Sequence, residues 1–319
     1  MKSPLRKRLP RELKSEFGKY LVVFIMMAIT IGFVSGFLVA DGSMLRAYDD
    51  SFQKYNIEDG YFQTKKKLTP AQKEDIEKSD VKVYENFYIE QKLTNGSTIR
   101  FFKNRKEVDK VCLMKGKMPK KSGEIAVDRM YADNNELKVG DTVKSRKKTF
   151  RITGLVALSD YSALFQNNND TMFDAVKFGV AIVTDKDFEA LNQVKVQYNY
   201  AWIYDKKPAT EKKEKKMAED LMEDMADVVT IESFVPQYQN QSIHFTGDDM
   251  GSDRAMIVML LYIVMAILAF VFGITISNTI RKEAGVIGTL RASGYTRREL
   301  ILHYICLLYT SPSPRDMRR

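Results

Sequence analysis

Two long segments without a charged side chain constrain this 319-residue sequence more than any other feature. No Asp, Glu, Lys or Arg occurs in residues 20–40 or in residues 255–280. A helix needs about 20 apolar residues to cross the hydrocarbon core of a bilayer, and both segments reach that length. No polar stripe interrupts the second segment, as it would in a half-buried helix of a soluble protein. The sequence therefore predicts a membrane protein.

A cleaved signal peptide is the alternative interpretation of the first segment. The apolar region of a signal peptide is usually about 7–15 residues long, which is shorter than residues 20–40. The far end of the segment, FLVADGSM, offers no clean A-x-A cleavage site. We therefore interpret residues 20–40 as a permanent transmembrane helix.

The positive charge of the chain lies beside these two segments. The net charge of +9 divides into +5 in residues 1–19, −1 in residues 41–254, +3 in residues 281–305 and +2 in residues 306–319. Lys and Arg accumulate on the cytoplasmic side of membrane spans. Both flanks are therefore expected in the cytoplasm and residues 41–254 outside it. The basic arm is expected to touch anionic membrane lipids, and no nucleic-acid partner is expected.

Residues 41–254 are expected to fold into an α+β domain. The stretch FYIEQKLTNGSTIRFF alternates apolar and polar residues around Asn95-Gly96, which predicts a β-hairpin with a type I′ turn. Further strands are expected at residues 124–127, 149–157, 179–183 and 200–204.

Two helices are expected in the same domain. Thr184 is expected to be the N-cap of a short helix that extends to Leu191. A longer helix is expected from residue 210 to 228, where Met217, Leu221 and Met225 recur every fourth residue as one apolar stripe. Lysines crowd the start of this helix and acidic residues its end, which opposes the helix dipole. We therefore expect the stripe to be held by packing.

The sequence contains no pattern that predicts catalysis, a cofactor or a metal site. No P-loop, no G-x-S-x-G elbow and no H-E-x-x-H helix occurs. The histidines are His244 and His303, and the cysteines are Cys112 and Cys306. This chain is therefore expected not to be an enzyme, and the role of Cys112 stays open.

The first apolar segment carries a G-x-x-x-G pair, Gly32 and Gly36. Small residues four positions apart let a second helix approach closely, which predicts a helix-packing face. Glycine is also generally common in membrane helices, and the sequence does not choose between these two explanations.

A short helix is expected directly after the second apolar segment. Ile287 and Leu290 would lie on one face of this helix, with Arg291 beside them. Gly288 has no side chain, so another molecule could approach the helix backbone closely at that position. Gly294 fits the stop position of a helix, because glycine adopts the left-handed conformation at low cost.

A new helix is expected to begin immediately after that stop. Thr296 and Glu299 have the spacing of a capping box. An apolar run then starts at residue 300, which predicts that the chain returns to the membrane.

The stretch IGTLRASGYTRREL resembles the cytoplasmic segment of MacB/FtsX-type permeases, which are subunits of ATP-binding-cassette (ABC) systems. The family pattern is E-I-G-x-L-R-A-x-G, and it matches this sequence at Ile287, Gly288, Leu290, Arg291, Ala292 and Gly294. Val286 stands where the family has an acidic residue. The stretches GEIAVDRMYADNNELKVGDTV and FRITGLVAL are similar to the extracytoplasmic core domain of the same family.

This resemblance implies a multi-pass protein of the bacterial plasma membrane that works with a separate cytoplasmic ATPase dimer. ATP hydrolysis there would move the outside domain, either to export a lipid, lipoprotein or peptide or to signal to cell-wall enzymes by mechanotransmission. The permease units would pair as a homodimer or pseudodimer. The residues expected to couple to the ATPase are Glu283, Ile287, Gly288, Leu290, Arg291 and Gly294.

Two other functions remain compatible with this layout. One is a two-span sensor with an outside ligand-binding domain, although a sensor would usually continue as a long heptad helix after residue 280. The other is a passive scaffold without energy coupling.

The end of the sequence, CLLYTSPSPRD, looks like a translated sequencing-library adapter. Pro312 and Pro314 would break the third span after a few residues. We therefore expect the natural protein to continue beyond Ile305.

The expected fold is an α-helical membrane protein, with two complete spans, the start of a third, and a large α+β extracytoplasmic domain. The expected boundaries are a basic arm (1–19), the first span (20–40), the outside domain (41–254), the second span (255–280), a coupling helix (281–295), the start of a third span (296–305) and a non-native tail (306–319).

Overall fold

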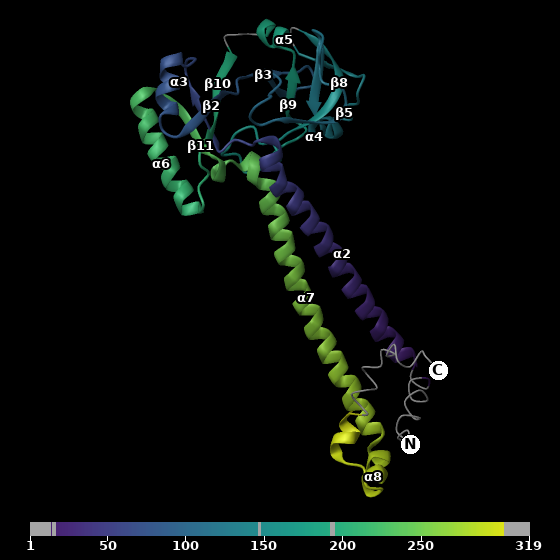
Figure 1. The fold of residues 1–319 in the computed structure, drawn as a ribbon. Helices are drawn as coiled ribbons and strands as arrows, with labels where there is room; N and C mark the ends of the chain where they lie inside the picture. Colours follow the sequence, from purple (N-terminus) through teal and green to yellow (C-terminus); the bar gives the residue numbers. More distant parts are fainter. Residues whose placement is uncertain (1–13, 15–16, 146–147, 192–194, 303–319) are drawn as a thin grey trace, which may run out of the picture. The chain divides into compact units, whose positions relative to one another are not determined.

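The computed structural model describes residues 14, 17–145, 148–191 and 195–302 (Figure 1). The chain forms two compact units. Residues 43–251 make up one, and the chain on either side of them makes up the other. Most of the expected basic arm, the end of the expected third span (303–305) and the expected tail (306–319) lie outside the described residues.

A single mixed sheet forms the framework of residues 43–251. Its strands are β1 (Gly60–Thr64), β2 (Val81–Glu85), β3 (Tyr88–Lys92), β4 (Thr98–Phe102), β5 (Val111–Gly116), β6 (Glu124–Asp128), β7 (Thr142–Lys144), β8 (Thr149–Leu158), β9 (Phe178–Val183), β10 (Val196–Tyr204) and β11 (Ile231–Pro236). They are ordered β11-β1-β10-β3-β4-β9-β6-β8-β5, with β2 also paired to β10 and β7 to β8. The pairs β4–β9 and β6–β8 are parallel, and the others among the described strands are antiparallel.

Helices accompany this sheet, which confirms a mixed α and β composition. They are α3 (Pro70–Glu77), α4 (Arg129–Asn134), α5 (Asp185–Ala190), α6 (Glu211–Val228) and the 3₁₀ turn η2 (Gln237–Gln239). The remaining helices are α2 (Phe17–Tyr55), α7 (Gln241–Lys282) and α8 (Ala284–Ala292).

The sheet buries two hydrophobic clusters. The larger one surrounds β4, β6, β8 and β9 and includes the fully buried Phe101 and Phe150. The smaller one surrounds β1 and β10 and contains Trp202, whose ring stacks on Phe234 at a centroid distance of 4.7 Å. The apolar side chains that alternate along the strands thus fill two separate cores.

The two helices expected in this domain are confirmed. The Thr184 side chain accepts a hydrogen bond from the Asp187 N–H at the start of α5, and Thr210 accepts one from the Lys213 N–H at the start of α6. Leu221 and Met225 of the predicted stripe are buried in the smaller cluster. Packing therefore holds α6 in place, as the sequence predicted.

The predicted hairpin is confirmed as β3 and β4, but its turn type is wrong. A type I′ turn needs positive φ at both central residues. Gly96 has a φ of +87°, whereas Asn95 has no positive φ. The Asn95 Oδ1 accepts hydrogen bonds from the Ser97 N–H at 3.1 Å and its hydroxyl at 2.8 Å. These side-chain bonds organise the turn with a single left-handed residue.

The other expected strands are also confirmed, as parts of β6, β8, β9 and β10. The strand β10 is longer than expected and begins at Val196. Its first half carries polar residues such as Asn199, which hide the apolar alternation. The strands β1, β2, β5, β7 and β11 and the helices α3 and α4 were not predicted.

Two helices are long and apolar enough to cross a membrane, judged by length and composition, within Phe24–Tyr55 and Gln241–Lys282. Both helices continue beyond the uncharged segments: α2 has 39 residues and α7 has 42. Charged residues end the apolar run but not the helix, because they tolerate helical geometry well. The positions of the charged residues therefore predict where the apolar segment ends, but they do not predict where the helix ends.

Candidate functional site

The first candidate site is α8, the segment that sequence analysis assigned to coupling. The helix α7 ends at Lys282, and Glu283 adopts φ −99° and ψ 12°, outside the helical range. The Ile287 N–H then donates to the Glu283 carbonyl at 2.9 Å and starts a new helix of nine residues. The Glu283 N–H still donates to the Thr279 carbonyl at 3.1 Å, so the break between α7 and α8 is confined to this one residue.

The end of α8 has the two hydrogen bonds of a Schellman motif. The Tyr295 N–H donates to the Leu290 carbonyl at 3.2 Å, and the Gly294 N–H donates to the Arg291 carbonyl at 3.1 Å. Gly294 has a φ of +94°, which glycine adopts without steric cost. The predicted helix stop at Gly294 is confirmed.

The predicted capping box follows directly. The Glu299 N–H donates to the Thr296 Oγ1 at 3.3 Å, and the Thr296 N–H donates to the Glu299 Oε2 at 2.9 Å. Residues 297–302 are helical. The short helix α8 is therefore fixed by a break at one end and a tight turn at the other.

The coupling residues divide into two groups on α8. Glu283, Ile287 and Leu290 are half-buried and share one face at helical spacing. The exposed members of the set are Gly288, Arg291 and Gly294. No atom of the described residues lies within 4 Å of a Cβ built on Gly288. Their coupling role stays a prediction.

The predicted packing residues Gly32 and Gly36 lie on α2. Both are exposed, and a Cβ built on either would meet no atom of the described residues within 4 Å. The G-x-x-x-G face is thus open in this chain, and its helix partner also stays a prediction.

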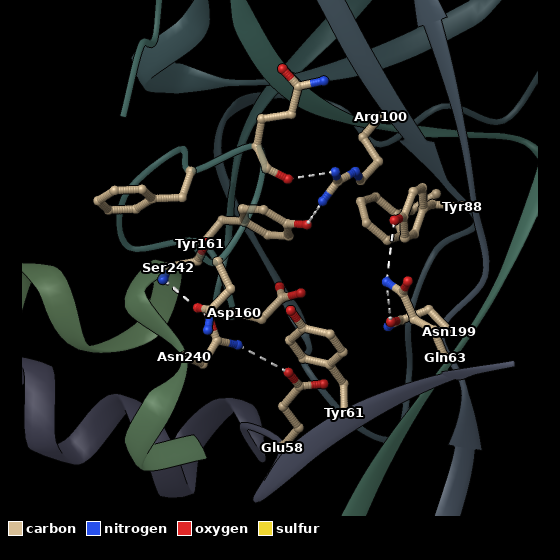
Figure 2. Close-up of a pocket in the computed structure, with 14 residues that line it drawn as sticks. Glu58, Tyr61, Gln63, Tyr88, Arg100, Asp160, Tyr161, Asn199, Asn240 and Ser242 are labelled. Atoms are coloured by element: carbon tan, nitrogen blue, oxygen red, sulfur yellow. Dashed lines mark hydrogen bonds between the residues drawn. The ribbon is translucent and has the colours of Figure 1, made fainter. Parts of the chain in front are cut away.

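A second candidate site is a polar cavity within residues 43–251, which sequence analysis missed. It has a volume of about 40 Å³ and is lined by 14 residues, drawn in Figure 2. They come from β1, β3, β4 and β10, the loop after β8, and the residues around the start of α7. Such a volume holds on the order of three water molecules.

Arg100 forms one wall of the cavity, and its guanidinium group is fully engaged. It donates to the Glu90 carboxylate at 2.9 Å, to the Tyr161 hydroxyl at 2.7 Å and to the Gln166 carbonyl at 2.8 Å. It also lies 4.3 Å from the centroid of the Tyr88 ring. This cation is therefore neutralised by its own partners.

Glu58 and Asn240 form the opposite end of the cavity. The Asn240 Nδ2 donates to the Glu58 Oε1 at 3.3 Å, and the Ser242 N–H donates to the Asn240 Oδ1 at 3.1 Å (Figure 2). Glu58 follows the end of α2 by three residues, and Ser242 is the second residue of α7. The cavity thus lies next to the C-terminal end of α2 and the N-terminal end of α7, both of which are within residues 43–251.

Three buried carboxyl groups surround one guanidinium group at this end. Asp109 accepts from the Glu58 N–H at 2.8 Å. Arg105 donates to Asp160 at 2.7 Å, and its Nη1 lies 3.7 Å from Asp109. Glu58, Asp109 and Asp160 are 2%, 0% and 5% exposed. The cluster therefore carries more potential negative charge than Arg105 can balance.

Burial shifts the titration of this cluster. Desolvation, reinforced by Asp160, raises the pKa of Asp109 to about 7. Desolvation, reinforced by Asp109 and Asp160, holds the pKa of Glu58 well above its ordinary value. A buried carboxylate without a balancing cation takes up a proton instead.

Several atoms of the cluster have no hydrogen-bond partner among the described residues. They include the Glu58 Oε2 and the Asp160 Oδ1, which belong to residues that line the cavity. The Nε and Nη2 of Arg105 are also unpaired within the described part of the chain, although Arg105 does not line the cavity.

Sequence analysis could not find this cluster. Its members lie between residue 58 and residue 160, and no two of the three carboxyl groups share a recognisable motif. The sequence shows only that charged residues occur in its strand-rich segments. Charged residues are expected at the surface, so this observation does not indicate a buried cluster. Hydrogen bonds from the Glu58 N–H to Asp109 and from Arg105 to Asp160 join three segments that are far apart in the sequence.

Comparison with known proteins finds similarities to solved structures, two of which are described here. No protein-family profile and no curated protein sequence matches this chain. The extracellular domain of the noncanonic ABC-type transporter YknZ from Gram-positive bacteria aligns with 12% identity and a TM-score of 0.29, over 55% of this chain and 97% of that domain.

The periplasmic region of MacB from Actinobacillus actinomycetemcomitans aligns with 14% identity and a TM-score of 0.29, over 55% of this chain and 87% of that region. At this identity and TM-score, neither similarity assigns a function.

Proposed function

We propose that this chain is the permease subunit of an ABC-type system and couples ATP hydrolysis by a separate cytoplasmic ATPase to movement of its outside domain. The observation that carries the proposal is α8, a nine-residue helix placed directly after a candidate membrane span and fixed at both ends. A helix held in this way transmits a displacement, whereas a mobile loop would absorb it.

The surface of α8 is suited to a protein partner. Arg291 is exposed at its edge, and Ile287 and Leu290 form a half-buried apolar face. Arginine is enriched among the residues that dominate protein interfaces, and it acts best where neighbouring side chains exclude water. The match to the permease pattern at these positions supports an ATPase as the partner.

The charge distribution supports the orientation. The basic flanks of the two candidate spans favour a cytoplasmic location for α8 and an extracytoplasmic location for residues 41–254. We infer a plasma-membrane protein that passes the bilayer more than twice, in contact with anionic lipids.

The open face at Gly32 and Gly36 supports pairing with a second permease unit, as a homodimer or pseudodimer. ATP hydrolysis is assigned to the partner, so this chain itself would have no enzymatic activity. The cargo would be a lipid, lipoprotein or peptide, or the movement itself would act on cell-wall enzymes.

The test is co-purification of the full-length membrane protein with a co-expressed cytoplasmic ABC ATPase from the same organism. Leu290→Asp places a charge in the half-buried face of α8 and is expected to reduce ATPase recovery at least tenfold, because an apolar anchor of an interface contributes about 2 kcal/mol or more.

Val286→Glu is the matched control. It adds the same charge to the same helix at an exposed position, where the permease pattern itself has an acidic residue. Recovery should stay within about twofold of wild type, since surface substitutions usually change free energies by no more than about 0.5 kcal/mol. Equal recovery with Leu290→Asp and wild type would refute coupling through α8 and favour the sensor or scaffold alternatives.

A further inference from the structure

We propose that the polar cavity of residues 43–251 binds a primary ammonium group, held by the buried carboxylates of Glu58 and Asp160. This inference is independent of the proposed permease function.

The unpaired atoms at the cavity determine what it can bind. Glu58 and Asp160 are both more than nine-tenths buried. A protonated Glu58 donates its hydrogen bond to the Asp109 side chain, but once Glu58 is ionised its Oε2 and the Asp160 Oδ1 are acceptors without a donor among the described residues. A buried acceptor without a donor costs about 1–3 kcal/mol. A ligand that satisfies both atoms must donate hydrogen bonds, which excludes an anion.

The charge of the lining points to a cation. Arg100 is already paired with Glu90 and donates to Tyr161 and Gln166, so it offers no free positive charge to a ligand. Arg105 pairs with both Asp160 and Asp109, so one guanidinium group faces three carboxyl groups. A cation would balance the charge that these carboxyl groups otherwise lose by protonation.

The remaining lining favours an ammonium group over a metal ion. Among the described residues, no group of three His, Cys, Asp or Glu side chains is arranged to hold a metal. The rings of Tyr61, Phe102 and Tyr161 also line the cavity, and aromatic rings attract cations. An ammonium group has few N–H donors, so two carboxylate oxygens and a neighbouring polar atom satisfy it.

The size of the cavity limits the ligand. At about 40 Å³ it admits the head of a primary amine. Free ammonium, a small amine and a lysine side chain of a peptide share this head. Because Asn240 binds Glu58 directly, the bound ammonium group would lie beside the residues that lead out of α2 and into α7.

The experiment follows thermal unfolding of the full chain in a maltoside detergent by tryptophan fluorescence. Trp202 is the one tryptophan of the sequence and is fully buried in the sheet, so it reports on this unit. Methylammonium chloride should raise the midpoint saturably, on the order of 5 °C at a hundredfold excess over Kd. Tetramethylammonium chloride at equal ionic strength has no N–H donor and should leave the midpoint unchanged.

Glu58→Gln tests the role of the carboxylate. Glutamine resembles the protonated acid and keeps the acceptor for Asn240, so the variant should fold and lose the methylammonium response. Glu85→Gln is the control, because Glu85 is an exposed carboxylate on β2 paired with Lys67; its response should equal that of wild type.

A measurement on the wild type alone provides a second test. Cation binding must displace the proton from Glu58, whose neighbours Asp109, Asp160 and Arg105 are described above. The methylammonium shift should therefore be larger at pH 8 than at pH 5. Ammonium chloride and a lysine-containing tripeptide, used in the same assay, distinguish the free ion from a peptide source.

Three results would overturn the proposal. They are no saturable shift in wild type, an equal shift with tetramethylammonium, and an unchanged response in Glu58→Gln. Any of them would mean that the cavity holds water only.

Discussion

Asp109 illustrates how burial sets the chemistry of single residues in this protein. It accepts hydrogen bonds from the Glu58 N–H and from the Asn86 Nδ2, and it is fully buried. These bonds favour the ionised form, but desolvation outweighs them and raises its pKa to about 7. The folded protein thus holds a proton on Asp109 in a pH range where the unfolded chain has released it.

The first prediction is that stability falls as the pH rises from about 4.5 to about 7. In this window the folded state binds more protons than the unfolded state, so the free energy of unfolding decreases with pH, by at most about 1.4 kcal/mol per unit for one proton. The contribution of Asp109 should end above pH 7, where Asp109 is ionised in both states. A decrease that continues above pH 7 would come from Glu58, whose pKa burial also raises. Urea denaturation followed by Trp202 fluorescence measures the slope.

Asp109→Asn should make that slope shallower. The amide cannot ionise, and Asn86 can rotate its own amide to pair with it, because its Oδ1 is unpaired within the described residues. The contribution of Glu58 has the same sign and remains. An unchanged slope in the variant would show that Asp109 does not titrate in this range.

At the level of elements, α6 depends on tertiary packing. Its first turn holds Glu211 and Glu214 among the lysines, and its last turns hold Glu223, Asp224 and Asp227, which interact unfavourably with the helix dipole. Thr210 caps its start, and Leu221 and Met225 bury its apolar stripe against β1 and β10. The packed stripe therefore provides most of the stability of this helix.

The second prediction follows from this stripe. Leu221→Ala should destabilise residues 43–251 by about 2–4 kcal/mol, because it removes a buried side chain and leaves a cavity. Met222→Ala changes the neighbouring residue, which is 44% exposed, and should cost less than about 0.5 kcal/mol. The measurement is urea unfolding of the full chain in detergent, and equal costs for the two variants would contradict the packing argument.

At the level of the whole molecule, two helices connect two compact units. The helices α2 and α7 each run from one unit into the other without interruption. The sheet, its two cores and the polar cavity belong to residues 43–251, whereas α8 belongs to the other unit. The two candidate sites therefore lie in different units of the chain.

The third prediction concerns membrane topology. In a chain with Cys112 and Cys306 replaced by serine, Met172→Cys should react with a membrane-impermeant maleimide in intact cells. Met172 is 81% exposed in the unit expected outside. Ser293→Cys, at the exposed end of α8, should react only after the membrane is permeabilised. The reverse pattern of labelling would contradict the proposed orientation.

The sequence by itself determined the features that depend on local chemistry. The two apolar helices follow from the absence of charge in residues 20–40 and 255–280, and the stop at Gly294 and the capping box at Thr296 follow from the preferences of those residues. The hairpin of β3 and β4 and the buried face of α6 follow from the periodicity of apolar residues.

The tertiary structure alone decided what long-range packing controls. The order of the sheet depends on contacts that sequence periodicity does not encode. The same is true of the turn at Asn95, where the side chains of Asn95 and Ser97 hydrogen-bond the distant Tyr131 hydroxyl. The same holds for the cavity, where Glu58, Asp109 and Asp160 come from three separate loops. Charged residues in a sequence indicate exposure by default, and only the fold shows which of them it buries.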